Sequence, residues 1–170
     1  MEYLILFLPL LAAFISGFFG KYIGDRSSEI LTSLFTSLSA ILSILVFYKV
    51  MSQSYENNLI ISTWINSGSL NVNWSIKIDA LSSVMLVVVT LISSLVHIYS
   101  IGYMSHDPHK PRFMAYLSLF TFSMLVLVTS DNFLQLFFGW EGVGLCSYLL
   151  IGFWYKKETA NNAAIKAFIV

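Results

Sequence analysis

Charge is scarce in this sequence: only 11% of its 170 residues are charged, whereas 57% are hydrophobic. Soluble domains carry roughly 25% charged residues, so this composition is typical of a chain embedded in lipid. Lys and Arg together number nine, as do Asp and Glu. This balance gives no reason to expect a nucleic acid as a partner, and the partner that the composition predicts is the lipid bilayer.

Cysteine and catalytic motifs are also scarce. The only cysteine, Cys146, lies inside an apolar run, which excludes an internal disulfide framework and a cysteine-based metal cluster. The sequence contains no glycine-rich phosphate loop and no haem or flavin motif. The loop SHDPHKPR holds two histidines and an aspartate, but its prolines favour a plain exposed turn over a metal site. We therefore predict no metal, no cofactor and no bond-making chemistry in this chain.

Long hydrophobic runs, in contrast, occupy most of the chain. A membrane-spanning helix needs roughly 20 mostly apolar residues. Five stretches satisfy this requirement: Tyr3–Gly20, Ile30–Tyr48, Ile78–Ile101, Phe113–Ser130 and Phe133–Tyr155. A sixth apolar helix starts near Ala163 and continues to Val170. We predict an all-α integral membrane protein with five transmembrane helices and the start of a sixth, and we expect a fragment of a longer membrane protein.

The connections between these runs predict a hairpin and an orientation. Between Lys49 and Lys77, the stretch WINSGSLNVNWSIKI alternates apolar and polar residues around SGS, which favours a short β-hairpin at the membrane surface. The first, third and fifth connections hold six basic residues, whereas the second and fourth hold two. By the positive-inside rule, the odd connections lie in the cytoplasm or matrix and the N-terminus lies on the opposite side.

One ionisable residue stands inside the fifth run. Glu141 is the ninth residue of that helix, roughly 12 Å from its outer end and near the middle of the hydrocarbon core. A charge at that depth costs on the order of 2.5–3.5 kcal/mol, so an intramembrane acid is a functional candidate. The alternative is a neutral acid hydrogen-bonded to a neighbouring helix. Small neighbours, and Tyr148 on the same face, favour a hydrated proton relay.

Three further ionisable residues are weaker candidates. Asp79 begins the third helix, where it either acts in proton transfer or complements the helix dipole. His97 lies near the inner end of that helix, where it either exchanges protons with the inner bulk phase or is a hydrogen-bonded spacer. Lys166 lies three residues into the sixth run, where it either belongs to a buried chain of acids and bases or extends to the inner surface.

Several motifs resemble one family. The run FGWEGVGLCSYLLIGFWY, followed by NNAAIKAF, closely resembles the fifth-helix region of the chain 5 (subunit L) family of respiratory complex I, NADH:quinone oxidoreductase. The stretches IDALSSVMLVVVTLISSLVHIYSIGYMSHDP and RFMAYLSLFTFSMLVLVTSDNFLQLF are similar to its third and fourth helices. The resemblance extends from about Trp64 to Val170. Sister antiporter-like subunits, and the large subunit of multi-subunit cation/proton antiporters, share the acid but usually lack WEGVGLCSYLLIGF.

The resemblance implies a membrane subunit that translocates protons, coupled to electron transfer from NADH to quinone in partner subunits. Glu141 matches the family's central proton-transfer glutamate, whose partner is a lysine on the seventh helix, beyond Val170. Lys166 matches the lysine of the family's AAxKAF motif and is not that principal partner. The implied NADH, FMN, iron–sulfur clusters and quinone belong to partner subunits, and the implied neighbours are other membrane subunits, especially the adjacent antiporter-like subunit.

The resemblance also suggests three parts. Residues 1–61 hold the first two helices and the start of the outer loop. Residues 62–112 form the N-terminal region of the antiporter-like family, with the outer hairpin, the third helix and an inner loop. Residues 113–170 begin the proton-translocating core of an antiporter-like helical bundle. The implied location is a bacterial inner membrane or, alternatively, a mitochondrial inner membrane.

Two other functions remain open from the sequence. The chain is alternatively part of the large subunit of a multi-subunit cation/proton antiporter, in which case its loss would impair growth under sodium stress rather than respiration. It is alternatively a truncated remnant that inserts into the membrane and transports nothing. Lysine-bearing helices in the continuing reading frame, or in a second polypeptide that co-purifies, would argue against the remnant.

Overall fold

The computed structural model describes residues 1–53, 55–68 and 70–169, and the elements alternate along the chain as the hydrophobic runs predict. In order they are α1 (Glu2–Ile23), α2 (Asp25–Gln53), β1 (Asn57–Ser67), β2 (Leu70–Ile78), α3 (Ala80–Tyr103), α4 (Lys110–Val128), α5 (Phe133–Ile151) and α6 (Glu158–Ile169). The helices α1 to α5 are each long and apolar enough to cross a membrane. The predicted helical membrane bundle, with five spanning helices and the beginning of a sixth, is thereby confirmed.

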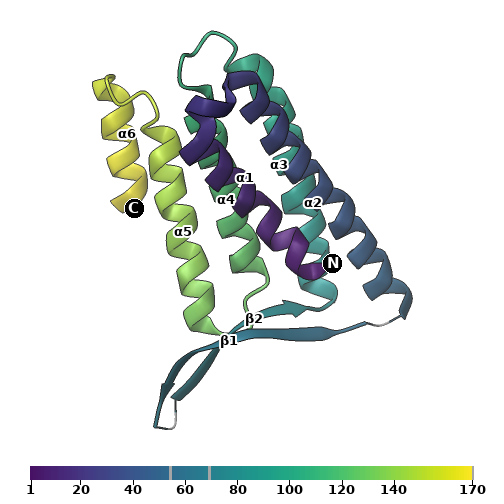
Figure 1. Cartoon of the computed structure of the whole chain (residues 1–170). Helices are drawn as coiled ribbons and strands as arrows, with labels where there is room; N and C mark the ends of the chain where they lie inside the picture. Colours follow the sequence, from purple (N-terminus) through teal and green to yellow (C-terminus); the bar gives the residue numbers. More distant parts are fainter. Residues whose placement is uncertain (54, 69, 170) are drawn as a thin grey trace.

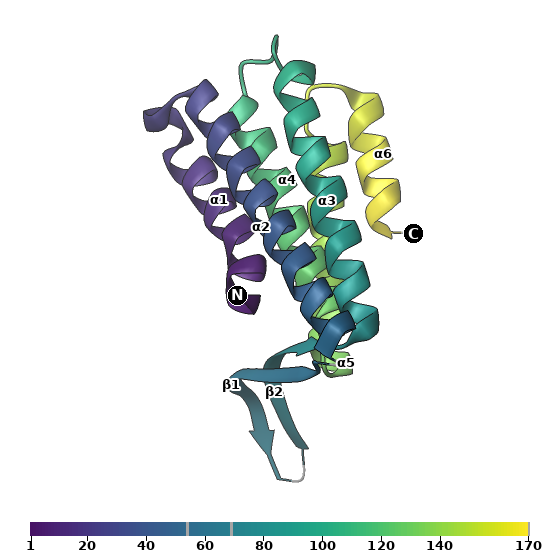
Figure 2. The ribbon, with the colours of Figure 1, turned by 90° about the vertical axis from the view of Figure 1, so that its right-hand side faces the viewer.

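The helices form a bundle in which α4 is central. It packs against α1, α2, α3 and α5, while α6 packs along α5 at the edge of the bundle (Figures 1 and 2). The α1–α2, α3–α4 and α5–α6 connections lie at one end, and the hairpin and the N-terminus lie at the other (Figure 1). The odd connections, which carry most of the basic residues, therefore gather at a single end of the bundle.

Apolar side chains cover the outside of this bundle, and hydroxyl side chains fill much of the space between helices. Phe18 is 72% exposed, while Ser43 on α2 and Thr90 on α3 are buried and lie 2.7 Å apart between their hydroxyl oxygens. Small hydroxyl residues let helix backbones approach closely and form hydrogen bonds between helices, as is typical of packing in membranes. Exposed apolar surface of this kind is stable only in lipid or against further protein.

Several helix ends differ from the predicted ranges. The helix α2 is longer than the predicted Ile30–Tyr48, and α6 begins at Glu158 rather than near Ala163. Hydropathy marks only the part of a helix that is apolar, whereas the backbone stays helical into the polar ends. The helices α1, α3 and α4 differ by one to three residues at each end, and Val170 lies outside the described residues.

The helix α5 is shorter than predicted. It ends at Ile151 instead of continuing to Tyr155. The chain turns at Gly152, whose amide donates to the carbonyl of Tyr148 at 2.9 Å. This turn is tied to α4, because the Arg112 guanidinium donates to the carbonyl of the next residue at 3.1 Å. A tertiary contact therefore ends α5 before the apolar run itself ends, which is why the sequence predicted a helix one turn longer.

The predicted hairpin is confirmed. Strands β1 and β2 pair antiparallel, with Asn57 opposite Ile78 and Ser67 opposite Leu70. Gly68 lies in the turn with a φ of 61°, a left-handed conformation that glycine adopts at no steric cost. The next turn residue of the SGS motif, Ser69, lies outside the described residues. The hairpin extends across the end of the bundle below α4 and α5 (Figures 1 and 2).

Candidate functional site

The site is built around α5, whose start is fixed by a side-chain cap. The side chain of Asn132 accepts a hydrogen bond from the Gln135 amide at 2.9 Å, which satisfies one of the free amides of the first turn. Counted from Phe133, Glu141 is the ninth of the 19 residues of α5. It therefore lies near the middle of a membrane-spanning helix, roughly 12 Å from the start of α5.

One face of α5 packs closely on α4. Gln135, Gly139 and Cys146 are buried on this face. A Cβ atom added to Gly139 would lie 2.7 Å from the Leu127 backbone, and one added to Gly142 would lie 2.9 Å from the Ser123 hydroxyl oxygen. The glycines therefore let the two helices approach more closely than larger residues permit. This is the close approach that the small residues around Glu141 suggested.

Glu141 itself lies on another face of α5 and is exposed in this structure. At 100° per residue, it shares a stripe with Tyr148, as the sequence predicted, and with Gly152. The C-terminal part of that stripe contacts α6: the Tyr148 and Phe168 rings are 5.6 Å apart, and a Cβ added to Gly152 would lie 3.3 Å from the Ala164 Cβ. The helix α6 therefore runs antiparallel along the stripe towards Glu141.

Lys166 does not reach Glu141. Because Phe168 lies opposite Tyr148, Lys166 lies roughly 13 Å from Glu141 along the α5 axis. Its side chain is exposed on a side of α6 other than the one that Ala164 presents to α5. In the part of the chain that the structure describes, none of the ion pairs includes Glu141 or Lys166. A role for Lys166 in a relay stays a prediction.

His97 is fully buried between α3 and α4. Its Nδ1 lies 2.8 Å from the Ser93 carbonyl oxygen, which only accepts, so Nδ1 carries the proton. Its Nε2 lies 3.0 Å from the Ser118 hydroxyl and, in the neutral imidazole, accepts a hydrogen bond from it. The Ser93 hydroxyl also contacts the Thr121 hydroxyl on α4. The interior position fits a hydrogen-bonded spacer, and the predicted exchange of protons with the inner bulk phase stays a prediction.

Asp79 caps α3. Its carboxylate accepts a hydrogen bond from the Ser82 amide at 2.8 Å, and the Ser82 hydroxyl accepts one from the Asp79 amide at 2.8 Å, which completes a reciprocal capping box. The hydrogen bond from Ser82, with the nearby charge of Lys77, holds the pKa of Asp79 below its ordinary value. Asp79 therefore caps α3 at the hairpin end of the bundle, and its part in proton transfer stays a prediction.

The four predicted site residues are therefore not brought together. Glu141 lies on α5 and Lys166 on α6. His97 lies between α3 and α4, and Asp79 lies at the start of α3. No group of three or more His, Cys, Asp or Glu side chains capable of holding a metal occurs within residues 1–53, 55–68 and 70–169. Of the four, Glu141 alone combines mid-membrane depth with an uncovered face.

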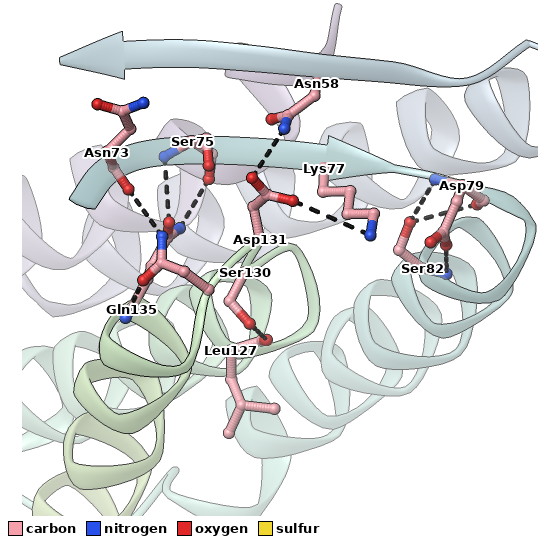
Figure 3. Close-up of polar contacts among 11 residues, drawn as sticks. Asn58, Asn73, Ser75, Lys77, Asp79, Ser82, Leu127, Ser130, Asp131 and Gln135 are labelled. Atoms are coloured by element: carbon pink, nitrogen blue, oxygen red, sulfur yellow. Dashed lines mark hydrogen bonds and ion pairs between the residues drawn. The ribbon is translucent and has the colours of Figure 1, made fainter. Parts of the chain in front are cut away.

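A polar clamp that the sequence did not predict fixes the outer end of α5. Gln135 is fully buried. Its side-chain amide donates to the Ser75 carbonyl at 2.7 Å and its side-chain oxygen accepts from the Ser75 amide at 3.1 Å (Figure 3). The Asn132 side chain donates to the Asn73 carbonyl at 2.8 Å. Strand β2 therefore holds the first turn of α5, six residues before Glu141.

Charged and aromatic groups extend this clamp. The Lys77 ammonium lies 3.9 Å from the Asp131 carboxylate, which also accepts a hydrogen bond from Asn58 on β1 at 2.8 Å (Figure 3). The rings of Trp74 on β2 and Phe138 on α5 lie 5.0 Å apart in an edge arrangement. The hairpin thus contacts the first two turns of α5, through Gln135 and Phe138, and the connection that precedes this helix, through Asp131.

We expect the substitution Gln135→Leu to release the hairpin from α5. It leaves the Ser75 amide and carbonyl without partners in a buried place, at a cost of about 1–3 kcal/mol for each group. The full-length protein in membranes should then show faster proteolytic cleavage of the hairpin. The matched control is Asn66→Leu, at an exposed amide of the same hairpin. Equal cleavage rates in the wild type and in Gln135→Leu would show that the clamp contributes little.

Comparison with protein-family models gives two matches. Residues 64–114 match the family described as NADH-Ubiquinone oxidoreductase (complex I), chain 5 N-terminus. Residues 130–170 match the family described as NADH:quinone oxidoreductase/Mrp antiporter, TM. The second match contains the whole of α5 and the described part of α6, and therefore includes both Glu141 and Lys166. The three-part division at residues 61 and 112 remains a prediction.

Curated relatives are similar along nearly the whole chain. The chain is 56% identical over 166 residues to NADH-ubiquinone oxidoreductase chain 5 of Phytophthora infestans, an alignment that covers 98% of this chain and 25% of the relative. It is 53% identical over 167 residues to NADH-quinone oxidoreductase subunit L of Rickettsia conorii, again covering 98% of this chain and 25% of the relative. The chain therefore spans about a quarter of the length of these relatives.

A solved structure shares the fold. It is the membrane-bound sulfane sulfur reductase, an archaeal respiratory membrane complex, with a TM-score of 0.82 and 19% sequence identity. The match covers 99% of this chain and 33% of the archaeal chain. At that identity the similarity concerns the arrangement of helices and strands, and it supports the bundle described above.

Proposed function

Because this chain belongs to the family of NADH:quinone oxidoreductase chain 5 and subunit L, we propose that it is part of a membrane subunit that translocates protons. Electron transfer from NADH to quinone supplies the energy and takes place in partner subunits, which hold the NADH, FMN, iron–sulfur and quinone sites. The membrane is the inner membrane of a bacterium or of a mitochondrion. The end of the bundle that carries the basic connections faces the cytoplasm or matrix.

The observation that carries the proposal is the position of Glu141. The carboxyl group lies in the middle of a spanning helix, on a face that no described element covers, while the opposite face is closely packed on α4. A carboxylate at this depth costs on the order of 2.5–3.5 kcal/mol, so it needs a cation, a water-filled space or a bound proton. Each of these solutions permits the carboxyl group to gain and lose a proton.

The proposed mechanism uses a cation that approaches and leaves Glu141. In the family, this cation is a lysine on the seventh helix of the longer protein. A nearby ammonium favours the charged carboxylate, and its withdrawal favours proton uptake. The structure supports this arrangement because α5 is held at its outer end by the hairpin and along one face by α4. Because the carboxyl group of Glu141 is fixed and the cation moves, the protonation of Glu141 depends on the position of the cation.

Infrared difference spectroscopy on the intact complex tests the proposal. We expect turnover with NADH to change the carbonyl stretching band of a protonated carboxyl group, because Glu141 gains and loses a proton. In the variant Glu141→Gln, this component of the difference spectrum should disappear. If the wild type and Glu141→Gln give the same difference spectrum, the carboxyl group does not change its protonation during turnover and the proposed relay is wrong.

Cation/proton antiport is the second candidate, and one observation favours it: the model for residues 130–170 names the Mrp antiporter as well as the oxidoreductase. The model for residues 64–114 names chain 5 of complex I alone, and this is why we prefer the first candidate. Disruption of the full-length gene distinguishes the two. Loss of NADH-dependent respiration supports the oxidoreductase, and loss of growth under sodium stress alone supports the antiporter.

A further inference from the structure

Three adjoining cavities follow one face of α4 at the end of the bundle opposite the hairpin. The first, of about 220 Å³, lies between α4, α5 and α6 and is lined by Arg112 and Tyr116. The second, of about 250 Å³, shares Arg112 and opens between the α3–α4 and α5–α6 connections. The third, of about 300 Å³, shares Tyr116 and lies between α1 and α4. We call these three cavities together the α4 groove.

The end of the α4 groove at the connections is positively charged. Arg112, Lys156 and Lys157 line it and Asp107 opposes them, so three cations and one carboxylate leave a net charge of +2 with His109 neutral. Asp107 is already engaged by the Trp154 indole N–H at 2.9 Å and by the His109 amide at 2.8 Å. Its partial burial raises its pKa, but these hydrogen bonds leave that pKa below the ordinary value.

Arg112 is prepared to bind an anion at this end. One Nη donates to the Phe153 carbonyl at 3.1 Å, and the guanidinium lies 4.7 Å from the Phe153 ring centre and 5.6 Å from that of Tyr155. These contacts fix the orientation of the guanidinium while leaving N–H groups free. The buried Nε has no partner among the described residues. A planar guanidinium held in this way matches the paired oxygens of a phosphate.

The other end of the α4 groove is apolar. It contains almost no polar surface and is lined by Phe14 and Gly17 on α1 and by Ala115 and Leu119 on α4. Arg112, Tyr116 and Leu119 follow one another at helical spacing of four and three residues, so they lie on one face of α4. The charged and apolar ends are therefore separated by roughly 10 Å along the helix, in a line that points into the bilayer.

We propose that the α4 groove binds an anionic phospholipid, with its phosphate at Arg112 and an acyl chain between α1 and α4. The charged end lies at the level where lipid headgroups lie, because the connections end the spanning helices there. Trp154 and Tyr155 beside it are residue types enriched at membrane surfaces. A basic pocket between spanning helices on the inner side is the kind of site that binds anionic headgroups. The charge of +2 selects an anionic over a zwitterionic headgroup.

Photolabelling of the intact complex in membranes tests this site. The probes are phosphatidylglycerol and phosphatidylcholine, each with a diazirine in the acyl chain, and the measurement is labelling of α1 and α4 peptides. We expect phosphatidylglycerol to label about fivefold more than phosphatidylcholine, and Arg112→Gln to remove most of that preference. Arg26→Gln, at an exposed cation in the first turn of α2, should leave the preference unchanged.

A second variant tests the apolar end independently of Arg112. Gly17→Leu should reduce labelling by both lipids, because its side chain would occupy the groove; an added Cβ meets only the Ala115 Cβ, at an ordinary 3.6 Å. Equal labelling by the two lipids overturns the proposal. Absence of labelling overturns it as well, since it means that other helices of the complex cover the groove. Displacement of the probe by millimolar inorganic phosphate also overturns it, because the site then binds the free anion.

Discussion

Proton translocation is expected to fall by roughly tenfold or more when Glu141 is replaced by glutamine in the full-length protein, because the proposed relay loses the group that carries the proton. Assembly should survive, since glutamine has nearly the same shape and the carboxyl group makes no ion pair among the described residues. The measurement is the initial rate of internal acidification of proteoliposomes, normalised to NADH oxidation by the same preparation.

Two further variants make this result specific. Glu141→Asp keeps an ionisable group but moves it by one methylene, so it should retain part of the proton translocation. Glu56→Gln removes an exposed carboxylate in the connection between α2 and β1, and should have the wild-type rate. Normal pumping by an assembled Glu141→Gln complex would contradict the relay, since a side chain that cannot ionise would then serve as well as one that can.

The sequence was informative where a pattern repeats along the chain. Apolar runs of the length of a bilayer identified α1 to α5, and alternation around SGS identified the hairpin. The helical period placed Tyr148 on the face of Glu141, and in the structure this tyrosine packs against Phe168 on α6. The family suggested by WEGVGLCSYLLIGF and NNAAIKAF is confirmed by relatives 53% to 56% identical to the chain.

The sequence was uninformative where a side chain forms hydrogen bonds to backbone groups far away along the chain. Gln135 looked like a polar residue near a helix end, yet it binds the Ser75 backbone, 60 positions away. No side-chain pattern marks such a partner, because every residue offers the same amide and carbonyl. The available signal was a glutamine inside the apolar run FLQLFF, because an amide buried there needs hydrogen-bond partners. Similarly, the axial distance between Lys166 and Glu141 depends on the turn after α5, which Arg112 fixes through a tertiary contact.

The second large effect is expected at the α4–α5 contact. We predict that Gly139→Ala lowers the stability of the assembled protein by about 1–3 kcal/mol or more, because the added Cβ would lie 2.7 Å from the Leu127 backbone. Backbone atoms of a packed helix cannot move aside as a flexible side chain does. The helices would have to separate, which would also displace α5 from the position that the hairpin fixes. The measurement is the amount and the melting temperature of the assembled full-length complex.

The other glycines of α5 supply the controls, because all gain the same helix propensity on replacement by alanine. Gly142→Ala meets the Ser123 hydroxyl oxygen at 2.9 Å, a side-chain atom that can rotate away, so its effect should be intermediate. Gly144→Ala meets nothing within 4 Å among the described residues and should be neutral or slightly stabilising, since only the gain in helix propensity remains. The expected order of destabilisation is therefore Gly139, then Gly142, then Gly144. If Gly144→Ala destabilises as much as Gly139→Ala, proximity to α4 is not what requires glycine in this helix.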